Sequence, residues 1–156
     1  MSDQENALTR ILDQAVQFEQ GAFDFYSSAI EKVTQPHVRS ALGDLAAEEV
    51  KHKQQLQALA AGDLETTVTV QKRGQIEDLK LAEYLVAPSL SEDATFQDVL
   101  IVAMQREKSS HEFYSTMAGI AEQETAKKLF EFLAQEELVH KNKVETLYDE
   151  VVYQQF

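Results

Sequence analysis

The chain has 156 residues, a formal net charge of −13, 44% apolar residues and no cysteine. This length and apolar content fit one globular domain. The lack of cysteine excludes disulfides, thiol catalysis and cysteine-ligated metal sites, and the acidic balance argues against nucleic acid or an anionic membrane as a partner. The polar, acidic start does not resemble a signal peptide, and no apolar run could cross a bilayer. We therefore expect a soluble, cytoplasmic protein.

Four segments of the chain carry apolar residues at helical spacing, and glycine and proline are sparse. Thr34 and Pro36 resemble an N-cap and first turn, which separates the first segment from the second. Ser91 or Asp93 is expected to cap the third segment, and a turn around Gly119 precedes the fourth. The predicted helices span about residues 4–33, 36–61, 94–120 and 123–150.

Residues 62–93 break this pattern and form an unusually long connection for a compact domain. Thr66 to Val70 is β-branched and expected to be extended, whereas Leu79 to Val86 could form a short helix. Two helical hairpins joined by one long crossover is a known bundle connectivity. We therefore predict an all-α four-helix bundle in a single domain over residues 1–156. A linker between two separate hairpins is less favoured, because neither hairpin could bury its apolar stripe alone.

An internal repeat aligns the two hairpins at an offset of 88 residues. Residues 15–59 and 103–147 share 14 of 45 positions, and many of the matches are polar. A repeat kept only for packing would preserve apolar residues and let polar ones vary. The matched polar pairs include Glu19 with Glu107, Tyr26 with Tyr114, Glu48 with Glu136, Glu49 with Glu137, His52 with His140, and Lys53 with Lys141.

Six of these polar residues fall within the apolar stripes, near the midpoints of the predicted helices. Four carboxylates in an apolar core are costly unless they are protonated, paired or bound to metal. A Glu and a His three residues apart share one helix face and can share a metal. The alternative is a set of paired core histidines with solvated acids on rotated helices. The six candidate ligands are Glu19, Glu49, His52, Glu107, Glu137 and His140.

This set of carboxylates and imidazoles exceeds what one tetrahedral zinc uses and suits two metals bridged by carboxylates. It matches the known arrangement of ferritin-like di-iron and di-manganese proteins. By ligand type Fe and Mn are favoured over Zn or Cu, and Zn stays a possibility. Glu49 and Glu137 are assigned as bridges, because each lies beside a His. Glu19 and Glu107 then become terminal ligands, and each metal takes one His.

The motifs resemble the rubrerythrin branch of the ferritin-like superfamily over both hairpins. Beside the paired Glu and Glu-x-x-His motifs, the chain carries Ala15-Glu19-Tyr26 and its repeat Ala103-Glu107-Tyr114. The resemblance implies a non-haem di-iron site, reduction of hydrogen peroxide or O2 in oxidative-stress protection, and a homodimer.

Three departures from that family bear on the activity. No cysteines are present for a rubredoxin domain, so an external electron-donor protein is expected. Ser110 stands where rubrerythrins tend to carry an extra carboxylate, and His140 stands where they often carry Glu. Two alternatives stay open: an iron-binding or ferroxidase protein for iron storage or delivery, and a bundle whose site only stabilises the fold. The hairpins could also exchange between two chains.

Some neighbouring residues are weaker candidates. Tyr26 and Tyr114 could hydrogen-bond a ligand carboxylate or could be ordinary core tyrosines. His111 lies one turn after Glu107 and could be an auxiliary ligand, although its repeat partner is Phe23. Glu48 and Glu136, offset from the apolar stripes, are expected to support the ligands or to lie on the surface.

Overall fold

Four long helices and one short 3-10 helix make up the regular structure of the computed structural model, which describes residues 3–62, 76 and 79–153. Within these ranges no strand occurs, in agreement with the predicted all-α class. The elements are α1 (Asp3–Ile30), α2 (Pro36–Ala60), η1 (Leu81–Leu85), α6 (Phe96–Ile120) and α7 (Glu124–Tyr153).

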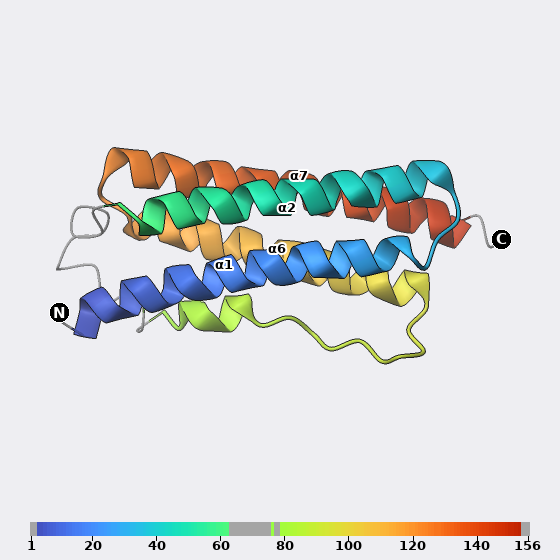
Figure 1. Cartoon of the computed structure of the whole chain (residues 1–156), viewed down its shortest axis with the longest axis horizontal. Helices are drawn as coiled ribbons and strands as arrows, with labels where there is room; N and C mark the ends of the chain where they lie inside the picture. Colours follow the sequence, from blue (N-terminus) through green and yellow to red (C-terminus); the bar gives the residue numbers. More distant parts are fainter. Residues whose placement is uncertain (1–2, 63–75, 77–78, 154–156) are drawn as a thin grey trace.

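The helices form a ferritin-like four-helix bundle of two hairpins (Figure 1). α1 packs along α2 and α6 along α7, while contacts of α1 with α6 and of α2 with α7 join the hairpins. The segment before α6 returns along the length of the bundle, so α6 starts beside the α1–α2 turn (Figure 1). Each helix therefore lies antiparallel to both of its neighbours.

The apolar core is divided into two clusters, and the predicted ligands lie between them in sequence. One cluster takes Leu8 to Val16 from α1 and Phe113 to Ala118 from α6. The other takes Tyr26 to Ala29 from α1 and Val99 to Ala103 from α6. Glu19 and Glu107 fall in the gaps between these runs. The packing thus isolates a polar layer at mid-bundle, sealed from water on both sides by apolar side chains.

Helix ends differ from the predicted boundaries by a few residues, and two predicted caps are wrong. The N-cap of α6 is Thr95 rather than Ser91 or Asp93. The Thr95 hydroxyl accepts a hydrogen bond from the Asp98 backbone N–H at 3.1 Å, and the Asp98 carboxylate accepts one from the Thr95 backbone N–H. α2 starts with Pro36 in its first turn, but its N-cap is Gln35 and not Thr34. α1 ends at Ile30, three residues before the predicted boundary.

The described part of the crossover covers one side of the bundle. The predicted helix over residues 79–86 is present as the shorter η1, which packs on α1 and α6 with Leu81 fully buried. The extended segment predicted for Thr66 to Val70 lies outside the described residues. The single-domain assignment for residues 1–156 stays a prediction. Among the described helices, none is long and apolar enough to cross a bilayer.

Candidate metal centre

All six predicted ligands lie inside the bundle, with 1–2% of each residue exposed. Each helix contributes from its middle: one Glu each from α1 and α6, and a Glu-x-x-His pair each from α2 and α7. The helical register explains the burial, since every one of these positions continues the apolar stripe of its own helix. Glu49, His52, Glu137 and His140 each offer a ligand atom within 4.8 Å of the others.

The Nδ1 atoms of both histidines face carboxylates of the opposite hairpin. His52 Nδ1 lies 2.8 Å from Glu137 Oε1, and His140 Nδ1 lies 3.0 Å from Glu49 Oε1. Longer approaches of 3.8 Å join His52 Nδ1 to Glu19 Oε2 and His140 Nδ1 to Glu107 Oε2. The two imidazole rings stack on each other, with centroids 5.4 Å apart and planes 14° from parallel.

Two tyrosines hold the remaining carboxylates, also across the hairpins. The Tyr26 hydroxyl donates to Glu107 Oε1 at 2.5 Å, and the Tyr114 hydroxyl donates to Glu19 Oε1 at 2.6 Å. Each tyrosine therefore supports the Glu of the other hairpin rather than the one on its own helix. These hydrogen bonds indicate that Tyr26 and Tyr114 support candidate ligand carboxylates and are not only core tyrosines.

The residues have the chemistry of a metal site. Glu19 Oε2 and Glu107 Oε2 are buried oxygens without a hydrogen-bond partner among the described residues. Buried carboxylate oxygens without a partner are costly, and a bound cation is one way to satisfy them. Carboxylate oxygens and imidazole nitrogens are donors that iron and manganese accept. The arrangement could bind a pair of iron ions, and the ligand roles assigned to single residues stay a prediction.

Comparison with known proteins agrees with this geometry, since residues 10–148 match the Rubrerythrin family. The chain belongs to the Rubrerythrin family. A solved structure of a hypothetical protein from Pyrococcus furiosus has the same fold, with a TM-score of 0.74 and 24% sequence identity. The match covers 94% of this chain and 91% of that chain. No curated protein matches the sequence.

Protons are unevenly distributed over the four carboxylates of this rubrerythrin site. Burial and the charge of neighbouring carboxylates raise the pKa of Glu49 and of Glu137 well above the ordinary 4.5. Burial also raises the pKa of Glu107. Glu19 is the exception: burial opposes its ionisation, but its interactions with Glu49, His52 and Tyr114 outweigh the burial and lower its pKa. A metal ion must displace the protons that Glu49 and Glu137 retain.

The two histidines differ although the repeat makes them equivalent. Burial lowers the pKa of His140 to about 4, with the charge of His52 as the second cause. His52 is buried too, but its interaction with the nearby Glu19 carboxylate outweighs the burial and raises its pKa. The metal-free site thus favours one imidazolium and one neutral imidazole. The stacked rings explain why the two do not ionise together.

The weaker candidates from the sequence differ in where they lie relative to the ligand cluster. His111 lies outside the ligand cluster, and its Nδ1 bonds the Ala134 carbonyl at 2.7 Å. Glu136 lies beside the site, with Oε1 4.0 Å from His52 Nε2. The repeat pointed to Glu136 and to its partner Glu48, but periodicity alone could not show which ligand either one approaches.

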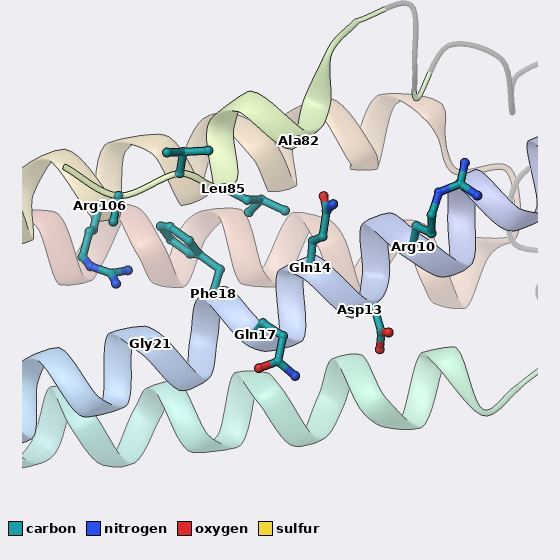
Figure 2. Close-up of a pocket in the computed structure, with 11 residues that line it drawn as sticks. Arg10, Asp13, Gln14, Gln17, Phe18, Gly21, Ala82, Leu85 and Arg106 are labelled. Atoms are coloured by element: carbon teal, nitrogen blue, oxygen red, sulfur yellow. The ribbon is translucent and has the colours of Figure 1, made fainter. Parts of the chain in front are cut away.

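A surface pocket of about 690 Å³ lies away from the six ligands, between α1, α6 and the crossover. Figure 2 shows Arg106 and Phe18 at one end of it and Arg10 at the other. The Arg106 guanidinium lies 4.7 Å from the centroid of the Phe18 ring. These two residues are repeat partners, so their contact joins equivalent points of the two hairpins. The repeat aligns the two positions in sequence, but the contact between them is seen only in the structure.

Proposed function

We propose that this rubrerythrin-family protein holds a carboxylate-bridged di-iron centre that reduces hydrogen peroxide or O2. The observation that carries the proposal is the burial of four carboxylates opposite two imidazoles in one layer of the bundle. Neutral side chains at these positions would pack the core at lower cost. Metal binding would offset the cost of burying six ionisable groups in the core.

The roles of single residues follow from their contacts. Glu49 and Glu137 face the histidine of the opposite hairpin, a position suited to bridging two metals. Glu19 and Glu107 are terminal ligands, each held by a tyrosine hydroxyl. Burial raises the pKa of Tyr26 and Tyr114 well above 10, so both hydroxyls keep their protons and stay donors. Hydrogen bonds of this kind orient a ligand and tune its basicity.

When bound, two iron ions would supply the two electrons that convert hydrogen peroxide, with two protons, into two water molecules. The chain contributes the ligands, the tyrosine donors and a dry apolar surround. No cysteine is available in this sequence to hold an electron-transfer iron. We therefore propose that electrons come from a separate donor protein. We also propose a homodimer, which analytical ultracentrifugation would test.

The test is peroxide consumption by iron-loaded protein under a steady supply of chemical reductant. We expect many turnovers per chain, with the iron still bound after desalting. The variant E49Q/E137Q should consume peroxide no faster than free buffer. One oxidation followed by release of the iron would contradict a redox enzyme and would support iron handling instead.

A further inference from the structure

A second group of potential ligands lies on the outer side of His52. Glu48, His52 and Glu136 each offer a ligand atom within 4.8 Å of the others. His52 is 1% exposed, whereas the side chains of Glu48 and Glu136 are 32% and 27% exposed. The group therefore runs from the surface of the bundle, between α2 and α7, to a buried imidazole.

Two independent features of this group indicate a cation. The first is that carboxylate oxygens of Glu48 and Glu136 lie within 4.8 Å of each other across two helices, where like charges repel. The second is His52 Nε2, which is buried, has no hydrogen-bond partner among the described residues, and faces Glu136 Oε1 at 4.0 Å. A cation between these atoms would offset the repulsion and satisfy the nitrogen.

One existing contact competes weakly with such a cation. Lys51 Nζ lies 3.4 Å from Glu48 Oε1, one turn along the same helix. The Lys51 side chain is 67% exposed, and an exposed pair of this kind contributes little because water screens it. Lysine can swing away into solvent at small cost, which leaves Glu48 available to a divalent cation.

We propose that Glu48, Glu136 and His52 Nε2 form an entry site, where a divalent cation binds before it passes into the core. This inference rests on the core being a metal centre, as proposed above. The opposite nitrogen of the same ring, His52 Nδ1, already faces Glu137 at 2.8 Å and Glu49 at 3.7 Å. The His52 imidazole thus lies between an outer carboxylate and the inner ones.

The tautomers of His52 give this arrangement an order of events. A cation that binds His52 must displace a proton from the ring. The resulting neutral imidazole has one lone pair, so only one of its nitrogens can bind a metal at a time. With a cation on Nε2, the proton sits on Nδ1 and can be donated to Glu137. Once the core is loaded through Nδ1, the proton moves to Nε2 and can be donated to Glu136. Filling of the core therefore weakens the outer site and frees it of metal.

The kinetic test follows Co(II) entering the metal-free full-length protein by stopped-flow absorption of the core site. We expect E48Q/E136Q to load at least about tenfold more slowly, since the acidic entrance concentrates cations, while its final Co(II) content equals that of the unaltered protein. The matched control is E31Q/E92Q, which removes the same charge from exposed positions in the connections between helices. Loading of E48Q/E136Q at the rate of this control would overturn the proposal.

A second measurement detects the entry site without the core. In E49Q/E137Q, which lacks the bridging carboxylates, Mn(II) binding followed by electron paramagnetic resonance should show one weakly held ion per chain. Adding E48Q/E136Q should remove that ion, and its persistence would overturn the entry site. A failure of the core proposal has another signature: the unaltered protein would bind no more Mn(II) than E49Q/E137Q does.

Discussion

Glu107 and Glu19 each accept a hydrogen bond from a tyrosine of the other hairpin. Glu107 has one oxygen bonded by Tyr26 and the other without a partner among the described residues. Glu19 has the same arrangement with Tyr114. Removing the hydroxyl would leave a buried carboxylate without this donor, and such a loss is costly.

Tyr26→Phe and Tyr114→Phe should therefore each lower the free energy of unfolding of the metal-free protein by about 1–3 kcal/mol. Urea denaturation monitored by circular dichroism measures this. Tyr148→Phe is the matched control. Tyr148 is partly exposed, and its hydroxyl accepts a hydrogen bond from the Gln97 side chain. It should change stability by about 0.5 kcal/mol or less. Midpoints of both core variants equal to that of the control would contradict this account.

The retained protons at the site make the metal-free protein sensitive to pH. Burial raises the pKa of Glu49 and Glu137 in the folded state, and contacts with Glu19 raise the pKa of His52 against its burial. Above the unfolded values of 4.5 and 6.5 the folded state holds more protons than the unfolded chain, so stability falls as pH rises. The pKa of His140 is lowered to about 4, so this residue makes stability rise with pH, but only below about pH 6.5.

We therefore expect the metal-free protein to unfold at lower urea concentration at about pH 8 than at about pH 6.5. The variant E49Q/E137Q should show a smaller difference, because it lacks two of the groups whose pKa is raised in the folded state. A protein without metal that becomes more stable as the pH rises from 6.5 would show that these pKa directions are wrong.

The buried positions of the six candidate ligands could be predicted from the sequence, but their hydrogen-bond partners could not. Glu19 and Glu107 interrupt apolar stripes, which shows that they point inward. Periodicity specifies the face of a helix, yet not which neighbouring helix that face meets. For this reason the bonds of Tyr26 and Tyr114 to the opposite hairpin, and the contact of Arg106 with Phe18, became visible only in the structure.

At the scale of the helices, Gly43 and Gly21 both lie inside long helices but have different surroundings. A Cβ at Gly43 in α2 would meet nothing within 4 Å, whereas one at Gly21 in α1 would lie 3.2 Å from Arg106 Nη2. Glycine inside a helix is less favourable than alanine by about 1 kcal/mol. Space therefore decides which replacement gains stability.

Gly43→Ala should raise the free energy of unfolding by about 0.5–1 kcal/mol. Gly21→Ala should gain less, because the Arg106 side chain must move and its position over Phe18 would be disturbed. Parallel urea titrations of the two variants provide the comparison. A loss of stability in Gly43→Ala, or a larger gain in Gly21→Ala, would contradict the packing described for α1 and α2.

Helix existence was predictable because four stripes run through the chain with little interruption. Helix ends were less so, as the caps show. Three residues with side chains that cap helices precede the third apolar stripe of the sequence: Ser91, Asp93 and Thr95. The choice of Thr95 depends on its reciprocal bonds with Asp98, which short-range sequence patterns only partly reveal.

On the scale of the whole molecule, the two hairpins meet through equivalent residues. His52 stacks on His140, Phe18 contacts Arg106, and the tyrosine and histidine bonds occur in reciprocal pairs. The bundle thus has approximate two-fold symmetry about the polar layer. That layer interrupts the apolar core, so metal bound there should add stability to both hairpins at once.

Divalent metal should therefore stabilise the folded protein by mass action. A cation present at 100 times its dissociation constant contributes about 2.7 kcal/mol if it binds only the folded state. Differential scanning calorimetry of iron-loaded protein and of protein treated with chelator should show the higher Tm with iron. The E49Q/E137Q variant should show a much smaller difference, because only the weak outer site remains. An equal Tm shift in that variant would place the stabilising metal elsewhere.

The most direct test of the central claim is the iron content of the protein after anaerobic loading with Fe(II) and desalting. The account predicts two iron ions per chain in the unaltered protein and essentially none in folded E49Q/E137Q. Iron retained by that variant at the level of the unaltered protein would contradict the proposed centre.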